Sequence, residues 1–254
     1  YMKKLLIVVF ILGFIPEFVS GQLWQAKRCE AVAGLGTTQF FGDIGGFSPK
    51  ENILGIKDFS FLQTRFDVNV GLKYRILQDL SVKLGFSFGK LHATDVRGSN
   101  EEREMEATST IFEPALTGEY YFIKSQRENS YLFTRGKKTR FTSIISSLDI
   151  YAFTGIGGLS YNVKGNDELV LHGMKDGGFT AIIPVGIGAN LLIMPDYNIG
   201  LELGGRYAFS DYLDGYTSIY SHSNDVYYFF NFIFTFKIPT NTSGLPLFLS
   251  SRKF

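Results

Sequence analysis

Hydrophobic and polar residues alternate strictly along several segments of this chain, each about ten residues long. The clearest segment is 226–236, in which Tyr228, Phe230 and Phe232 fall on one face while Tyr227 and Asn231 fall on the other. Because successive side chains of a β-strand point to opposite faces, this period of two predicts strands rather than helices. The eight predicted strands cover residues 30–40, 64–75, 79–91, 109–122, 147–161, 179–192, 197–209 and 226–237.

The two faces of the predicted strands fit a membrane better than water. In residues 79–91, Leu84, Phe86 and Phe88 form an apolar face, whereas Lys83 shares the other face with serine and glycine. A strand of about ten residues tilted by about 45° crosses the hydrocarbon core of a bilayer, and a membrane barrel carries its apolar face outward. We therefore predict an all-β fold, an eight-stranded antiparallel transmembrane β-barrel. The charged residues expected to fill its narrow lumen as pairs are Arg65, Lys73, Lys83, Arg206, Asp67, Glu113, Glu119, Asp149 and Glu202.

The connections between the predicted strands differ in length. Residues 77–79 and 194–196 form tight turns, whereas other connections are long and either polar or rich in glycine. Outer-membrane barrels keep short turns in the periplasm and long loops outside, so both termini are predicted to be periplasmic. Connection 123–146 departs from this rule because it is long, and a tail, 239–254, follows the last strand. The predicted outer loops are 41–63, 92–108, 164–178 and 210–225.

The N-terminal residues predict export from the cytoplasm. Two lysines precede an apolar run over 5–15 and then small residues, which is typical of a signal peptide over 1–21; residues 22–254 then form the barrel and its periplasmic tail. Cleavage removes two lysines and one glutamate from 25 basic and 24 acidic residues, so no excess charge favours nucleic acid. The single cysteine, Cys29, cannot form an internal disulfide and is expected at the start of the barrel. No later apolar run reaches the roughly 18 residues of a transmembrane helix.

No catalytic arrangement stands out, and neither a cofactor nor a metal is expected. His92, His172 and His222 fall in three different predicted loops, which favours solvated side chains over a metal site. Serine and histidine occur without a recognisable nucleophile and base. Glu202 and Arg206 lie four residues apart on one inward face, and a structural pair in the lumen explains them better than a catalytic or gating pair.

A short acidic motif follows the seventh predicted strand. Asp211, Tyr212 and Asp214 precede Gly215, and this composition favours a turn where the strand leaves the membrane. Calcium binding is an alternative interpretation, but it requires many more converging oxygens than two carboxylates supply.

The long connection 123–146 is strongly basic. Such a segment favours a docking surface for a periplasmic partner or acidic polymer, and its alternative is a solvated turn. The residues proposed for partner binding are Arg135, Lys137, Lys138 and Arg140.

Several stretches resemble the PorG-like outer-membrane barrels of Bacteroidota, a family associated with type IX secretion. Residues 36–45 are similar to the family's glycine-rich, aromatic–Gly–Asp opening, and residues 202–206 followed by 211–214 are the most specific match. The chain departs from the family at Gly215, where relatives often have an acidic residue, and in its longer and more basic connection 123–146. Further similar stretches are 89–95, 111–113, 119–122, 151–157 and 184–188.

The resemblance implies a non-enzymatic accessory barrel in the cell outer membrane that contacts a periplasmic ring or lipoprotein component of the secretion and gliding machinery. Its expected partners are that component and outer-membrane lipid, and not nucleic acid. One alternative is a stand-alone surface barrel of the OmpA/OmpX kind, which binds through its outer loops. The candidate face for that alternative carries Glu101, Glu102, Glu104 and Glu106. A second alternative is a narrow pore for small solutes, against which the crowded lumen argues.

Overall fold

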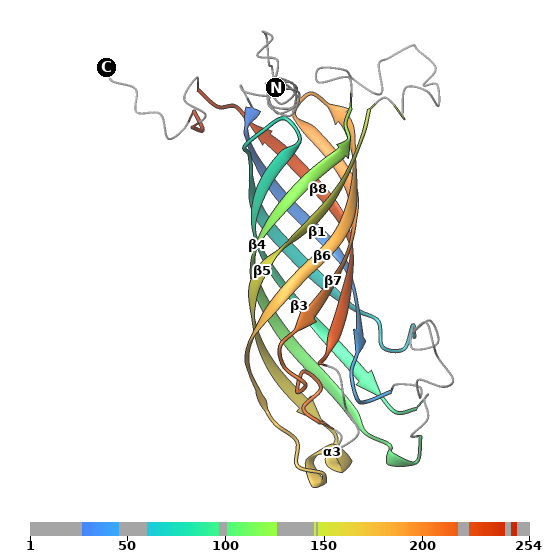
Figure 1. The fold of residues 1–254 in the computed structure, drawn as a ribbon. Coiled ribbons are helices and arrows are strands. Elements are labelled where there is room, and N and C mark those ends of the chain that lie inside the picture. Colours follow the sequence, from blue (N-terminus) through green and yellow to red (C-terminus); the bar gives the residue numbers. More distant parts are fainter. Residues whose placement is uncertain are drawn as a thin grey trace, which may run out of the picture.

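The computed structural model is a closed barrel of eight antiparallel strands (Figure 1). It describes residues 27–45, 60–96, 101–125, 145, 147–217, 224–241 and 245–247. The strands are β1 (Cys29–Phe41), β2 (Arg65–Arg75), β3 (Leu80–Thr94), β4 (Glu106–Ile123), β5 (Leu148–Gly165), β6 (Gly177–Met194), β7 (Tyr197–Ala208) and β8 (Val226–Ile238). They follow one another around the barrel in chain order, and β1 pairs with β8 to close it. The predicted eight-stranded antiparallel fold is confirmed.

The two ends of the barrel differ in character. β1 begins and β8 finishes at the same end, which we call the terminus end (Figure 1). The predicted tight turn after β2 lies at this end, where the amides of Ile76 and Leu77 donate to the carbonyl of Leu80 at 2.9 and 3.1 Å. The opposite end, which we call the loop end, carries the longer connections and the short helix α3 (Asp167–Leu171) (Figure 1).

The strands are unequal in length, and the difference is larger than the predicted ranges indicate. β4, β5 and β6 have 18 residues each, against 11 in β2 and 12 in β7. The sequence analysis ended β5 at residue 161, whereas the structure continues it to Gly165. The inward side chain of Val163 stays buried in this extension, so packing continues after the outward face has become polar.

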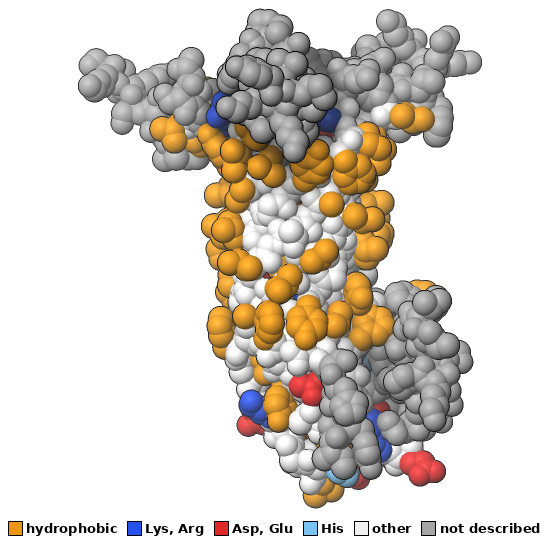
Figure 2. Space-filling view, in the orientation of Figure 1, with side chains coloured by type: hydrophobic (Ala, Val, Ile, Leu, Met, Phe, Trp, Pro, Cys, Tyr) orange, Lys and Arg blue, Asp and Glu red, His pale blue; other side chains and the backbone are white. Residues whose placement is uncertain are grey.

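The outward face of the strands is apolar. Ile156 and Phe232 are 69% and 66% exposed, and no water-soluble barrel presents so many large apolar side chains around its wall. On the side shown in Figure 2, apolar side chains form a band near each end of the wall, and charged side chains lie beyond these bands at the two ends. From Tyr228 to Phe236, β8 rises about 20 Å, taking about 3.3 Å per residue and a tilt of about 40°, which approaches the apolar height of a membrane barrel. Within the described ranges, no helix has the length and apolarity needed to cross a membrane.

Candidate functional site

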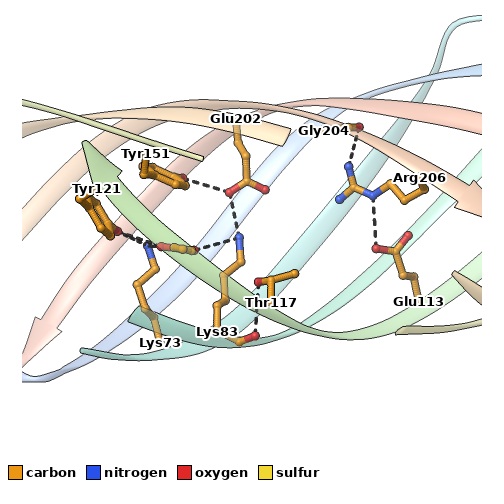
Figure 3. A network of polar contacts seen from close by, with 10 residues as sticks. Lys73, Lys83, Glu113, Thr117, Tyr121, Tyr151, Glu202, Gly204 and Arg206 are labelled. Carbon is orange, nitrogen blue, oxygen red and sulfur yellow. Dashed lines mark hydrogen bonds and ion pairs between the residues drawn. The ribbon is translucent and has the colours of Figure 1, made fainter. Parts of the chain in front are cut away.

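The terminus-side half of the lumen holds a network of buried ion pairs (Figure 3). The Nζ of Lys73 lies 2.7 Å from a carboxylate oxygen of Glu119, and the Nζ of Lys83 lies 2.8 Å from Glu202 and 3.5 Å from Glu119. The hydroxyl of Tyr121 donates to Glu119 at 2.8 Å. Buried charges are stable only when they are paired and hydrogen-bonded; each charge of this network is paired, and one Glu119 oxygen has the Lys83 ammonium at 3.5 Å in place of a hydrogen bond.

A second ion pair lies further toward the loop end. The Nε of Arg206 is 3.3 Å from a carboxylate oxygen of Glu113, whose other oxygen accepts from the Tyr227 hydroxyl at 2.7 Å. The guanidinium also donates to the carbonyl of Gly204 at 2.7 Å and lies 4.1 Å from the centre of the Phe229 ring. The cation is therefore held by charge, hydrogen bonds and an aromatic face together.

Glu202 and Arg206 both lie in the lumen, but they do not pair with each other. Glu202 binds Lys83 on β3 and accepts from the Tyr151 hydroxyl at 3.0 Å, while Arg206 binds Glu113 on β4. Residues four apart on one strand are separated by about 13 Å along the chain, so side chains from across the barrel reach each of them first. The expected pair is thus corrected to two separate pairs.

The other residues expected to fill the lumen with charge behave differently from one another. Asp67 is buried and accepts from the Asn231 amide at 3.0 Å. Asp149 accepts from the Ser125 backbone amide. Arg65 donates to the backbone carbonyls of Leu62 and Thr64, just before β2, and not to the network.

The loop-side half of the lumen is apolar, which the sequence analysis did not predict. Fully buried side chains from several strands meet there, and the segment 209–217 adds Leu213, which is 0% exposed. The members of this cluster include Phe40, Leu91, Met105, Ile111, Leu159, Ile182 and Phe229. The lumen retains a cavity of about 30 Å³ between the Lys83–Glu202 and Arg206–Glu113 pairs, which is large enough for one or two water molecules.

The segment 209–217, which we call the mouth plug, closes the loop end. The carboxylate of Asp214 accepts from the backbone amides of Asp43 and Ile44 at 3.0 and 3.1 Å, and from Tyr216 at 3.0 Å. The Leu213 carbonyl accepts from the Ser109 hydroxyl. The plug therefore ties the connection after β1 to the wall of β4.

Two further contacts hold the plug to neighbouring connections. The Lys175 amide donates to the Gly215 carbonyl at 2.9 Å, and its ammonium lies 4.4 Å from the centre of the Tyr212 ring. The Arg103 guanidinium lies 5.6 Å from the centre of the Tyr216 ring, and it is held there by Asp95 at 3.0 Å and by the Asp43 carbonyl, to which it donates at 3.0 Å. All four long connections thus contribute to the closed mouth.

Two plug carboxyls have strongly perturbed acidities. Burial raises the pKa of Asp214 to about 7, against the lowering effect of the backbone amides that it accepts from. Burial and the nearby charge of Asp214 raise the pKa of Asp225 to about 9, although Asp225 accepts from the Leu213 amide at 2.8 Å. These carboxyls therefore act as buried acceptors at the mouth.

The acidic motif follows the end of β7, where a turn was predicted, but it folds inward and is buried in part. Asp214 is 1% exposed and points into the barrel mouth, whereas Asp211 accepts from the Thr217 hydroxyl within the plug. The turn formed by Asp214 and Gly215 is present, because Gly215 has a φ of +80°. Across the described ranges, no group of three or more His, Cys, Asp or Glu side chains could hold a metal ion.

The remaining expected residues lie apart from this site. His92 is buried on β3 and contacts the Thr108 hydroxyl at 2.9 Å, which corrects its expected place in a solvated loop. His172 follows α3, and His222 lies outside the described residues. Cys29 starts β1 as a free thiol, as predicted. The proposed partner-binding residues Arg135, Lys137, Lys138 and Arg140, together with the signal peptide over 1–21, also lie outside the described residues.

The geometry defines a class of protein: a transmembrane β-barrel whose lumen is filled by ion pairs at one end and by apolar side chains at the other. No protein-family model matches the chain, and no curated protein matches its sequence significantly.

Several solved structures are similar to this barrel. One is Neisserial surface protein A, with 10% identity over 84% of this chain and 97% of that one, and a TM-score of 0.43. A major outer membrane protein from Thermus thermophilus has 13% identity over 83% and 100% of the two chains, with a TM-score of 0.43. The outer membrane enzyme PagL has 10% identity over 82% and 99%, with a TM-score of 0.37. The strand ladders themselves establish the architecture.

Proposed function

We propose that this chain is a non-enzymatic outer-membrane barrel that serves as an accessory anchor of the type IX secretion and gliding machinery. The observation that carries the proposal is the filled lumen, in which Lys73, Glu119 and Arg206 occupy one half and apolar side chains the other. In a barrel of this width, side chains fill the described lumen apart from the cavity of about 30 Å³, so no wide aqueous path remains and we assign the role to its two ends.

The terminus end has the chemistry to meet a periplasmic ring or lipoprotein component. Lys27 pairs with Asp196 at this rim, and Lys124 lies 3.8 Å from Asp79. Such partly exposed pairs contribute little to stability and can exchange partners readily. The basic segment 123–146 joins β4 to β5, and β4 finishes and β5 begins at this same end of the barrel. In this proposal both termini are periplasmic.

Photo-crosslinking in native cells tests the proposed contact. A crosslinking residue placed at Arg135 or Lys138 is expected to capture a periplasmic ring or lipoprotein component, identified by mass spectrometry. A crosslinker at Glu102, which is exposed at the loop end, is the matched control and should not capture it. Reversing the charge of residues 135–140 should abolish the capture. Capture of no periplasmic protein by an inserted barrel would overturn the proposal.

A second candidate is a stand-alone barrel that binds an external ligand through its loop end. The observation in its favour is that this end extends beyond the apolar wall and exposes Leu171 and Phe179, at 78% and 74%. Under this candidate, Leu171→Ser weakens binding of cells to the external surface, while charge reversal at 135–140 has no effect. The narrow-pore alternative predicts steady conductance in a planar bilayer, which the filled lumen opposes.

A further inference from the structure

The chain beyond the last strand forms a small hairpin at the terminus end. Pro239 directly follows β8 and has no backbone amide to donate to a neighbouring strand, so the barrel ladder ends there. Thr240 then pairs with Pro246 as an isolated antiparallel bridge. We call residues 239–241 and 245–247 the C-terminal hairpin.

Hydrogen bonds within the hairpin satisfy much of its own backbone. The Leu247 amide donates to the Pro239 carbonyl at 3.0 Å, and the Asn241 amide donates to the Leu245 carbonyl at 2.8 Å. The side chain of Asn241 accepts from the Leu245 amide at 2.9 Å. A segment with paired backbone groups enters an apolar environment at lower cost than an open chain, because few polar groups lose water without a partner.

The hairpin presents two apolar side chains on one face. Leu245 and Leu247 are 52% and 55% exposed, while Pro246 between them is less exposed. Because alternate residues of an extended segment share a face, both leucines lie on the same exposed face of the hairpin.

The position of this face matters as much as its composition. In Figure 1 the hairpin projects sideways from the terminus end, beyond the outline of the barrel wall. In the same orientation, Figure 2 shows apolar side chains on this projection, close to the edge of the apolar wall. The wall at that edge includes Phe236, Tyr197 and Met194, so the leucines continue a surface that faces lipid.

We propose that the C-terminal hairpin lies in the headgroup region of the membrane leaflet at the terminus end, with Leu245 and Leu247 inserted beside the upper parts of the acyl chains. The occupant of this apolar face is therefore lipid rather than a protein. The inference rests on the membrane placement of the barrel in the proposed function. It adds a contact that fixes the depth of the barrel and holds the terminus end against the membrane surface.

Tryptophan fluorescence in vesicles with brominated lipids tests this placement. The chain has a single tryptophan, Trp24, so Trp24→Phe provides a background without tryptophan. Three reporters are then introduced one at a time into the folded barrel: Leu247→Trp in the hairpin, Phe234→Trp on the wall and Leu171→Trp at the loop end. Folding of each variant is checked by its heat-dependent migration in electrophoresis, and only folded protein is compared.

The expected result is a distinct pattern for each reporter. Leu247→Trp should emit at shorter wavelength than Leu171→Trp and be quenched most by lipid brominated near the headgroup. Phe234→Trp should be quenched most by lipid brominated deeper in the chain. Emission and quenching of Leu247→Trp equal to those of Leu171→Trp, with Phe234→Trp quenched, would overturn the hairpin inference alone. Absence of quenching at Phe234→Trp would overturn the membrane placement as well.

A second pair of variants keeps the inference testable if a reporter perturbs the hairpin. Leu245→Ser together with Leu247→Ser removes the apolar face without touching the barrel ladders. In sealed vesicles, added protease should cut this variant within the C-terminal hairpin at least several-fold faster than the parent chain. Equal cleavage rates would contradict the inference.

Discussion

The ammonium of Lys73 lies 2.7 Å from the carboxylate of Glu119, and both side chains are almost wholly removed from solvent inside the barrel. The two residues come from β2 and β4, which are separated by β3, so the pair spans the lumen rather than a single ladder. This ion pair cross-braces the polar half of the barrel.

Breaking this pair should destabilise the barrel strongly. Lys73→Met leaves Glu119 buried with only the more distant Lys83 ammonium, and loss of one partner of a buried ion pair costs about 3–5 kcal/mol. The free energy of unfolding, measured by urea titration of the refolded barrel, should fall by about 3 kcal/mol, since Lys83 compensates in part. The double variant Lys73→Met with Glu119→Leu removes both charges and should recover most of the loss. A double variant as unstable as the single one would show that the charge is not the cause.

Glycine is required where two strands crowd each other inside the barrel. A Cβ added at Gly155 would lie 2.1 Å from the Leu116 carbonyl oxygen, whereas a Cβ at Gly118 would meet nothing closer than 3.9 Å. Gly155→Ala should therefore force the β4–β5 ladder apart and cost about 1–3 kcal/mol. Gly118→Ala, on the same pair of strands, should change stability by less than about 0.5 kcal/mol. Equal effects in urea titration would contradict this geometry.

The mouth plug should depend on its buried leucine. Leu213→Ala removes a side chain that is 0% exposed and should cost about 2–5 kcal/mol of local stability through the cavity that it leaves. We expect a protease to cleave this variant much faster at the loop end. Electrophoresis of the fragments measures the rate. Leu171→Ala, at a position 78% exposed, is the control and should leave the rate unchanged. Similar rates for both variants would mean that the plug is not held by Leu213.

The plug should weaken as the pH rises. The folded pKa values of Asp214 and Asp225, about 7 and about 9, lie above the unfolded value, so the folded plug binds protons more tightly than the unfolded chain. Their contribution to stability is complete below the unfolded pKa of about 3.9 and is lost as the pH rises through the two folded values. The nearby carboxylates of Asp43 and Asp211 act in the same direction on Asp225.

A midpoint of thermal unfolding that falls between mildly acidic and alkaline pH would verify this expectation. Asp225→Asn keeps an acceptor for the Leu213 amide but carries no titrating proton, so the fall should be smaller in this variant. An equal fall in both proteins would show that these carboxyls do not cause the pH dependence.

The outer architecture was predictable because it rests on local patterns. Strict alternation, as in residues 226–236, requires only the period of a strand, and the tight turn at 77–79 follows from the short gap between two alternating runs. Outward residues such as Phe86 and Phe232 were assigned correctly for the same reason.

The interior was predictable only in part because it depends on contacts across the barrel. Lys83 and Glu202 are 119 positions apart, and nothing local indicates that they meet. Near the loop end the inward face becomes apolar and the outward face becomes polar, as at Asn162 and Lys164, so an apolar face no longer identifies the lipid side of a strand. Leu91 and Leu159 consequently gave no indication of the apolar half of the lumen. The mouth plug was missed because Asp and Gly in residues 211–215 indicate a turn without indicating the direction in which the turn folds.

The seam between β1 and β8 has a consequence for how the molecule is assembled. It runs from Cys29 opposite Ile238 to Phe41 opposite Val226, so it joins the first strand made during synthesis to the last. Until β8 is present, β1 and β7 both remain open edges, and an open edge is not tolerated in the hydrocarbon of a membrane. Contacts of such long sequence separation also form slowly. Insertion and closure are therefore one concerted event, in which the whole chain has to be available before any part of the wall is complete.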